Sequence, residues 1–470
     1  MFDDASQRDA ALAQLTAAGF AASDATPWQQ ATPVLRGDFE ADAAASTRFF
    51  ALTQSLLQRL PTKPRREAAQ ALAALELLRS ARAARERFLS LHAGSLYERL
   101  TAARSRFVLA QDLPDAAARL VPGLCPTPAQ VAAEAAVRQG DKDGVEIDQS
   151  LLLAHVLAGE ASGMHLCHAM LLPRAESLEQ LRHLQASGSI DLGSALVETN
   201  GRASRVTLKN PKCLNAEDQQ TIAAVEQAVD LALLDTRSGV AVLRGSAIDH
   251  PKYAGRRVFS SGINLTDLYH GKIPYLWYVR REMGFVNKLF RGLAYADRPA
   301  DEVTGATLEK PWIAQLDTFA IGGGCQYLLA TDYVVAGSDA YMTLPARKEG
   351  IVPGVANLRL TRFVGDRLAR QLVMMERRLD CASPEGRLIC DQVVEPDAVA
   401  ATVDQVVARM TGSGVVSAAA NRRAFRVAQE PLDLFRRYMA VYARDQAECH
   451  FSPALINNLE AHWQAHDRPG

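Results

Sequence analysis

The chain has 470 residues, of which 48% are hydrophobic and 22% charged, which is typical of a folded globular protein and unlike a disordered one. At roughly 150 residues per domain, this length corresponds to about three domain-sized units. Because the net charge is −1, aromatic residues are only 6% and no apolar run reaches ~18 residues, we expect no nucleic-acid partner and no membrane span.

The first part of the chain, residues 1–195, is rich in Ala, Leu and Arg and is predicted to be a helical N-terminal domain. Apolar side chains recur at helical spacing over residues 49–60, and Pro61 and Pro64 are expected to end that helix. A second amphipathic run covers residues 67–89.

Residues 196–375 change in character and are predicted to be an α/β domain, because short apolar strands alternate with helical segments. Asn200-Gly201 between two strand-like runs predicts a hairpin. The expected elements are strands at 196–199, 204–208, 239–245, 312–316 and 333–336, and helices at 216–234 and 325–329.

The last part, residues 376–470, is predicted to be a helical C-terminal segment. It contains basic pairs at Arg422-Arg423 and Arg436-Arg437. We expect these arginines to form a solvated or interface face.

Common catalytic and metal-binding signatures are absent: there is no P-loop, no Gly-x-Ser-x-Gly turn and no His-Glu-x-x-His. His165 and His168 form a pair without further ligands, which favours local packing. Residues 139–144 resemble part of a calcium loop but lack its closing glutamate. No metal site is predicted.

The seven cysteines are odd in number and form no Cys-x-x-Cys pair, which indicates reduced thiols. The residues Met1-Phe2-Asp3-Asp4 are acidic where a signal peptide would be basic. Both features predict a cytoplasmic location.

The most informative feature is a pair of glycine turns about 60 residues apart, one at residues 259–265 after an expected strand and the other at residues 319–326 between a strand and a helix. Glycine allows the backbone to turn its amides toward a ligand without a Cβ in the way. Two amides that converge on one carbonyl oxygen would form an oxyanion hole. A single such turn is more often purely structural, but the pair favours a site.

These turns, with Asn215-Ala216 upstream and residues 349–354 downstream, resemble the crotonase (enoyl-CoA hydratase/isomerase) superfamily. The resemblance implies a ββα spiral core that binds acyl-CoA thioesters. It also implies that the amides of Ile263 and Gly323 hold the thioester oxygen.

The sequence departs from the hydratase pattern at both catalytic glutamates, since Gln326 and Ala346 stand in their places. Ordinary water addition is therefore not expected, because an amide does not exchange a proton near pH 7. Glu349 lies close by, and we interpret it mainly as a structural hydrogen-bond or ion-pair partner, with a catalytic role as the alternative.

A narrower resemblance, which covers most of the chain, is to the 3,5-dihydroxyphenylacetyl-CoA 1,2-dioxygenases within this superfamily. It is carried by residues 214–218, 250–253, 257–260, 262–265, 280–282 and 324–326, and by residues 143–149 of the helical region. It implies a dioxygenase without metal or organic cofactor that supplies a dihydroxyphenylglycine precursor for nonribosomal peptides, with the acyl-CoA and O2 as substrates. Cys325 departs from the pattern, where an alanine is expected.

The resemblance also implies a role for each site residue. The expected catalytic residues are Ile263, Gly323, Gln326, Arg281 and Glu217, and the expected substrate- and CoA-binding residues are Ser261, Gly262, Asn264, Leu265, His250, Lys212, Arg257, Gly322 and Gly324. The alternative for Arg281 is a surface ion pair, and for Glu217 a helix N-terminal charge.

The resemblance further implies a homo-oligomer, either a trimer or a hexamer, in which the helical C-terminal segment of residues 376–470 takes part in oligomerisation. Two other functions stay open: another crotonase-type reaction, such as a thioesterase or isomerase, and a non-catalytic acyl-CoA-binding protein.

Overall fold

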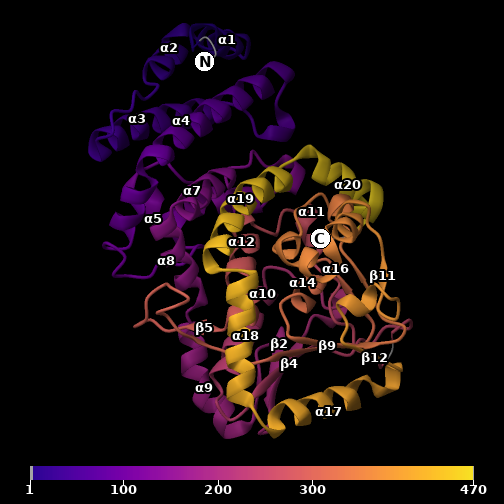
Figure 1. Ribbon diagram of the computed structural model, residues 1–470. Coiled ribbons are helices and arrows are strands. Elements are labelled where there is room, and N and C mark those ends of the chain that lie inside the picture. The colour runs from indigo at the N-terminus through magenta and orange to yellow at the C-terminus, as the bar shows by residue number, and fades with distance from the viewer. Residues whose placement is uncertain (1–3, 254, 469–470) are drawn as a thin grey trace.

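The computed structural model describes residues 4–253 and 255–468, so most of the acidic N-terminal run, Met1-Phe2-Asp3, lies outside the described residues. Figure 1 shows a helical N-terminal region, a sheet-containing core and a set of C-terminal helices that returns to the N-terminal region.

The N-terminal region is helical, as predicted. Its helices are α1 (Asp4–Ala17), α2 (Ala22–Gln30), α3 (Phe39–Leu57), α4 (Ala68–Leu100), α5 (Leu113–Leu120), α6 (Pro128–Ala135), α7 (Ile147–Ala158), α8 (Glu160–Leu171) and α9 (Ala175–Ser187). The Asp38 side chain accepts a hydrogen bond from the Ala41 amide and so caps α3, which ends at Leu57 before Pro61. Helix α4 continues eleven residues beyond the predicted end at Leu89.

The core is built on a seven-stranded sheet in the order β1-β2-β3-β4-β7-β9-β12. The strands are β1 (Ser189–Asp191), β2 (Ala195–Thr199), β3 (Ala203–Leu208), β4 (Val240–Gly245), β7 (Trp312–Leu316), β9 (Tyr333–Gly337) and β12 (Gln392–Val394). The predicted hairpin is confirmed as the antiparallel pair β2–β3, and the strands from β3 to β12 are parallel.

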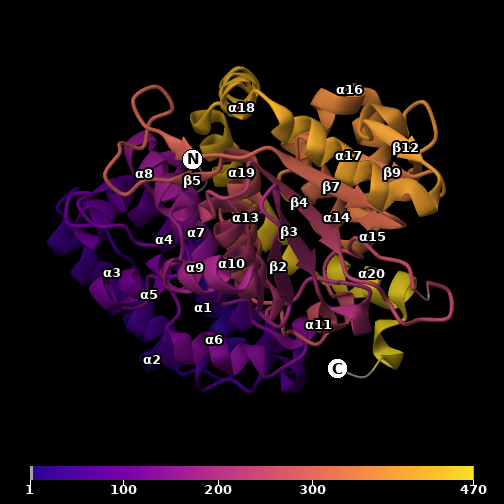
Figure 2. The same ribbon diagram turned by 90° about the horizontal axis from the view of Figure 1, so that it is seen from below.

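Both faces of this sheet are covered, which explains why its central strands are continuously apolar. In β4, Ala241 and Leu243 belong to the main core, whereas Val240 and Val242 pack with valines of α17 (Val399–Gly412). Helix α10 (Thr221–Leu234) contacts β2 and β3. In Figure 2 the N-terminal helices and α17 lie on opposite sides of the sheet.

Helix α10 begins at Thr221 and not at Ala216, so the predicted start was wrong. The Asp218 carboxylate accepts hydrogen bonds from the amides of Gln220 and Thr221, both at 2.9 Å, and this starts the helix late. Glu217 instead forms a parallel β-bridge with Ile263.

Smaller elements complete the core. These are the parallel pair β8 (Phe319–Ile321) and β10 (Tyr341–Thr343), which continues antiparallel into β11 (Leu379–Asp380), the pair β5 (Leu293–Ala294) and β6 (Thr307–Leu308), and helices α11 (Leu265–Tyr269), α12 (Tyr275–Met283), α13 (Phe285–Arg291), α14 (Gly323–Leu328), α15 (Ala346–Glu349) and α16 (Ala356–Met374). The short strands β11 and β12 follow residue 376, so the C-terminal segment, which was predicted to be helical, also contributes two strands.

The C-terminal helices are α17, α18 (Val415–Gln429), α19 (Leu432–His450) and α20 (Pro453–Trp463). Helix α19 packs extensively against α7 of the N-terminal region and also contacts α8 and α12. The C-terminal segment therefore joins the N-terminal helices to the core within one chain.

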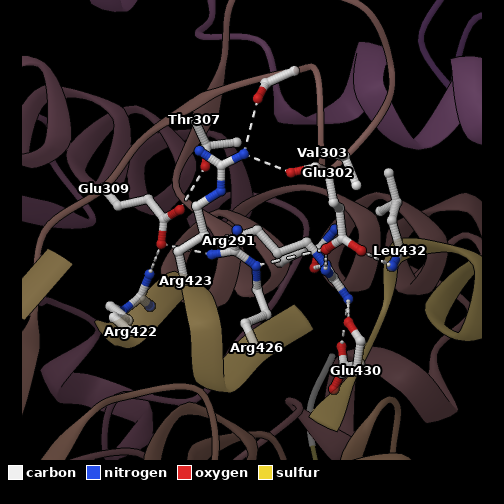
Figure 3. A network of polar contacts seen from close by, with 12 residues as sticks. Arg291, Glu302, Val303, Thr307, Glu309, Arg422, Arg423, Arg426, Glu430 and Leu432 are labelled. Carbon is white, nitrogen blue, oxygen red and sulfur yellow. Dashed lines mark hydrogen bonds and ion pairs between the residues drawn. The ribbon is translucent and has the colours of Figure 1, made fainter. Parts of the chain in front are cut away.

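The basic run of this segment is largely buried, contrary to the expectation of a solvated or interface face. Arg422, Arg426 and Arg436 are buried, whereas Arg437 is exposed. Arg422 and Arg426 both bind the carboxylate of Glu309, at 2.8 and 2.6 Å. They belong to a network that we call the arginine cluster, which consists of Arg291, Arg359, Arg422, Arg426, Glu302, Glu309 and Glu430. Figure 3 shows the part of the cluster that contains Arg291, Arg422, Arg426 and the three glutamates.

Candidate functional site

The two glycine turns lie against each other. The Ile321 amide donates a hydrogen bond to the Ser260 carbonyl at 3.0 Å, and Ser260 and Ala320 form a parallel β-bridge. Gly262 has φ +81°, and a Cβ there would lie 2.8 Å from the Ile321 carbonyl oxygen. Glycine at this position permits both the left-handed backbone and the close approach of the two turns. Within the described residues, no regular strand lies between β4 and the first turn, so this turn does not directly follow a strand as expected.

The turns leave two backbone donors free. The Glu217 amide donates to the Gly262 carbonyl and the Asn264 amide donates to the Glu217 carbonyl, both at 2.7 Å. These two bonds fix the backbone on both sides of Ile263. Within the described parts of the chain, neither the Ile263 nor the Gly323 amide donates a hydrogen bond, and Gly323 is the first residue of α14. These are the two amides that the sequence predicts for an oxyanion hole.

Several neighbouring residues shape these turns. The Ser261 hydroxyl donates to the Cys213 carbonyl at 3.1 Å, and the Asn264 side chain caps α11, whose first residue is Leu265. A Cβ on Gly324 would lie 2.9 Å from the Ser260 carbonyl oxygen. Their part in CoA binding stays a prediction.

Next to the turns, one buried arginine joins three polar side chains. The Arg281 guanidinium holds the Glu217 carboxylate with two bonds of 2.5 and 3.0 Å. Its Nη1 also donates to Glu282 at 2.5 Å and to the Gln326 side-chain oxygen at 2.6 Å. Only 2% of Arg281 is exposed, so the alternative of a surface ion pair was wrong.

The charges in this group support one another. Burial opposes the charge on Arg281, but the carboxylates of Glu217 and Glu282 outweigh burial and raise its pKa well above the ordinary value. Burial raises the pKa of Glu282, against the opposing effect of Arg281. We call Glu217, Arg281, Glu282 and Gln326 the pocket cluster.

Glu349 is the exception among the buried carboxylates of this site. It ends α15 and is 8% exposed, and within residues 4–253 and 255–468 its carboxylate has neither a hydrogen bond nor an ion pair. Burial raises its pKa to about 7. The interpretation of Glu349 as a structural hydrogen-bond or ion-pair partner is therefore wrong for this structure.

These residues line a single pocket. Its walls include Glu217, Ile263, Arg281, Gly322, Gly323, Gln326 and Glu349, together with Trp277, Tyr278, Glu282, Ala346 and Tyr442. The structure thus brings all five predicted catalytic residues together. Sequence reasoning missed the aromatic residues, because Trp277 and Tyr278 belong to no motif and Tyr442 lies on α19, far away in the chain.

The predicted CoA-binding cations lie outside this pocket. Lys212 and His250 are exposed, and Arg257 is half-buried with its guanidinium donating to the Gly245 carbonyl at 3.1 Å. The backbone next to Lys212 is tied to the first turn through the bond from Ser261 to Cys213. Their role stays a prediction.

The candidate metal ligands have ordinary packing contacts. His165 Nδ1 lies 2.8 Å from the Tyr97 hydroxyl, and His168 Nε2 lies 3.1 Å from the Tyr295 carbonyl. The described residues contain no group of three His, Cys, Asp or Glu side chains placed to hold a metal ion.

Within residues 4–253 and 255–468, every helix is too short or too polar to cross a bilayer.

Comparisons with known proteins agree with this site. The model of the enoyl-CoA hydratase/isomerase family matches residues 198–441. A (3,5-dihydroxyphenyl)acetyl-CoA 1,2-dioxygenase from Amycolatopsis orientalis is 45% identical over 411 residues, which cover 87% of this chain and 92% of that protein. The chain belongs to the crotonase family.

Other relatives match a smaller part of the chain. A probable enoyl-CoA hydratase from Rhizobium meliloti is 28% identical over 208 residues, 43% of this chain and 69% of that protein. Among solved structures, a carnitinyl-CoA hydratase from Mycobacterium avium aligns with a TM-score of 0.48 and 22% identity, over 58% of this chain and 97% of that chain.

Within the crotonase family, this site keeps the two free amides and replaces the expected acid–base pair. The Gln326 side chain binds Arg281, and Ala346 offers no proton-transfer group although it lines the pocket. Cys325, where an alanine was expected, is buried, and its thiol lies 3.0 Å from the Ala320 carbonyl. Its sulfur therefore contacts the backbone of the second turn.

Proposed function

We propose that this protein is a (3,5-dihydroxyphenyl)acetyl-CoA 1,2-dioxygenase that converts its thioester and O2 into 3,5-dihydroxyphenylglyoxylate and CoA. The observation that carries the proposal is the 45% identity over 87% of the chain to the enzyme of that name. The probable hydratase matches only 43% of the chain and is less similar. The dioxygenase is therefore more similar in sequence than the probable hydratase and matches a larger share of the chain.

The pocket suits the chemistry of an arylacetyl thioester. Loss of an α-proton gives a carbanion that is delocalised into the ring and the thioester. The free amides of Ile263 and Gly323 would donate to the resulting enolate oxygen, where one such donor is worth roughly 3–4 kcal/mol.

Oxygen would then react with the enolate directly. One electron passes from the enolate to O2, and the two radicals combine into an α-peroxide. The peroxide attacks the thioester carbon and expels CoA, and loss of the second α-hydrogen with cleavage of the O–O bond leaves the α-keto acid. Atoms balance without another reductant, so the proposal includes no metal or organic cofactor.

The pocket cluster would recognise the aryl ring. Glu217 and Gln326 carry acceptor and donor groups for the ring hydroxyls, while Arg281 fixes both side chains. The aromatic side chains of Trp277, Tyr278 and Tyr442 line the same pocket and offer packing surfaces for the ring.

The CoA moiety would bind outside the pocket. Its phosphates need cationic partners, and Lys212, His250 and Arg257 are among the basic side chains that flank the two turns, together with Lys252 and Arg256. Within the described residues, none of the first three forms an ion pair with an acidic side chain, whereas neighbouring Arg256 is paired with Asp339 at 2.7 Å.

We also propose a cytoplasmic trimer or hexamer that supplies a precursor of nonribosomal peptides. Exposed apolar side chains on α16 and α18 support the assembly, among them Met375 beyond the end of α16 at 71% exposure and Phe425 at 65%. Light scattering at micromolar concentration would contradict the assembly if it showed only a monomer.

An oxygen electrode tests the function directly. Purified protein, dialysed against a strong chelator, is mixed with a panel of arylacetyl-CoA thioesters. We expect about one O2 consumed per CoA released, with the 3,5-dihydroxyphenyl substrate the fastest. Full-rate CoA release without O2 would indicate a thioesterase instead, binding without turnover would indicate a non-catalytic protein, and loss of activity that iron restores would contradict cofactor independence.

A further inference from the structure

The pocket holds three buried glutamates and one arginine, and the arginine serves only two of them. Glu217 and Glu282 each bind the Arg281 guanidinium. Glu349 lines the same pocket but is not paired with any cation in the described parts of the chain. Its neighbours in α15, Arg347 and Lys348, both pair with Glu376 at the surface.

The position of Glu349 is as distinctive as its lack of a partner. A Cβ built on Gly322 would lie 3.6 Å from both carboxylate oxygens of Glu349. The next residue, Gly323, carries one of the two free amides. The carboxylate therefore lies beside the predicted oxyanion hole and on the wall of the pocket that the acyl group would enter.

The groups that face Glu349 do not neutralise it. Burial raises the pKa of Tyr278 on α12 and of Cys325 on α14, and the nearby Glu349 charge raises both further, so both side chains stay protonated. From α20, which packs on α15, the uncharged Asn458 binds the Arg347 carbonyl. Across the pocket, Arg281 is engaged with the pocket cluster.

A buried carboxylate without a partner is costly to keep in a fold. Such a group is suited to one task in particular, because an efficient general base titrates near the working pH. Burial raises the pKa of Glu349 to about 7. Neither of the two glutamate positions expected for hydratases corresponds to this residue.

We propose that Glu349 is the general base that removes the first α-proton of the bound arylacetyl thioester. The Cα–H bond breaks, an O–H bond forms on the Glu349 carboxylate, and the electron pair moves to the thioester oxygen between the Ile263 and Gly323 amides. This assignment rests on the proposed function for its substrate, but the proton transfer precedes any reaction with O2.

Deuterium exchange without oxygen isolates that step. Wild-type protein and 3,5-dihydroxyphenylacetyl-CoA are mixed in D2O under argon, and uptake of deuterium at Cα is followed by mass spectrometry. We expect Glu349→Gln to slow the enzyme-dependent exchange by about 10²–10⁴-fold. Glu385→Gln, at a half-buried glutamate that lies outside the pocket and pairs with Arg377, serves as the matched control and should exchange at the wild-type rate.

Binding and rescue separate a base from a structural residue. Glu349→Gln should retain the wild-type circular dichroism and bind a non-reactive thioether analogue of the substrate within about twofold. Glu349→Ala should regain part of the exchange on addition of formate, which supplies the missing carboxylate. Wild-type exchange in Glu349→Gln, or exchange lost together with analogue binding, would overturn the assignment.

The outcomes also separate this inference from the proposed function. Wild-type exchange that depends on Glu349 without O2 uptake would support the base and contradict the dioxygenase. Normal O2 uptake together with deuterium exchange that does not depend on Glu349 would support the dioxygenase and contradict the assignment of Glu349 as the base. No exchange in the wild type would contradict the base.

Discussion

The arginine cluster and the pocket cluster both bury glutamates, and they treat them in opposite ways. Glu430 accepts bonds from Arg291, Arg359 and Arg362, and although burial alone would raise its pKa, Arg359 and Arg291 outweigh burial and hold the pKa at about 2. Glu349 is also buried, at 8% exposure, but it is unpaired within the described residues, and burial raises its pKa to about 7. The comparison teaches that burial alone does not decide what a glutamate does; its partners do.

The two regions differ in purpose for the same reason. In the arginine cluster, which ties α13, α16 and α18 together, each of the three glutamates is paired with at least one arginine, so no carboxylate is left free for chemistry. The pocket has one more carboxylate than its guanidinium pairs with. An unmatched charge lowers stability and is typical of a functional site.

Removing the Glu430 carboxylate should have the largest effect on stability. Glu430→Ala leaves Arg291 and Arg359 buried without their shared partner, so we expect a loss of about 3–5 kcal/mol in the free energy of unfolding. Urea unfolding measures this loss, with Glu385→Ala, at a half-buried glutamate, as the control. A loss no larger than that of the control would show that the arginine cluster does not stabilise the fold.

The matching change in the pocket should act in the opposite direction. The folded-state pKa of Glu349 is raised from 4.5 to about 7, so its charge destabilises the fold as pH rises through this range. The free energy of unfolding of Glu349→Gln should therefore equal that of the wild type below about pH 4.5 and exceed it by about 3 kcal/mol above pH 7. A variant less stable than the wild type at pH 8 would contradict the unpaired state of Glu349.

A carboxylate in place of Gln326 tests how firmly the pocket cluster is balanced. In Gln326→Glu a third carboxylate would compete for Arg281, and the amide donor would be lost. We expect kcat/KM to fall at least tenfold, about 1.4 kcal/mol, while circular dichroism stays unchanged. An unchanged kcat/KM would place Gln326 outside the site.

The smallest effect is expected where an arginine is exposed. The Arg437 side chain is 71% exposed and pairs with Asp433 at 2.8 Å. Arg437→Ala should therefore lower the free energy of unfolding by less than about 1 kcal/mol. Its neighbour Arg436 is buried and donates to the Ala158 carbonyl at 2.9 Å, so Arg436→Ala should cost several times more. Equal losses would show that burial does not separate these two neighbours.

The oxyanion hole was predictable from sequence because its geometry depends on glycine. The left-handed φ of Gly262 and Gly322 leaves a local signature at both turns. The hairpin and the central strands were predictable for a similar reason, since they are apolar on both faces. Strands β11 and β12 were missed because they are only two and three residues long.

What sequence could not show is how charges are matched across the fold. Arg281 and Glu217 are 64 residues apart, and only the fold makes them a buried pair. The arginines of α18 look like surface residues in sequence, because their partners lie on distant elements. That Glu349 has no partner depends on every neighbour at once, and no local pattern records this.

The most direct measurement is an infrared pH titration of the carboxyl groups, from about pH 5 to about pH 9, in the wild type, Glu349→Gln and Glu430→Gln. We predict that the wild type loses one protonated-carboxyl band with a midpoint of about pH 7. The band should be absent in Glu349→Gln and present in Glu430→Gln. A wild type without such a band, or a band that persists in Glu349→Gln, would contradict the claim that the pocket leaves this one glutamate unpaired.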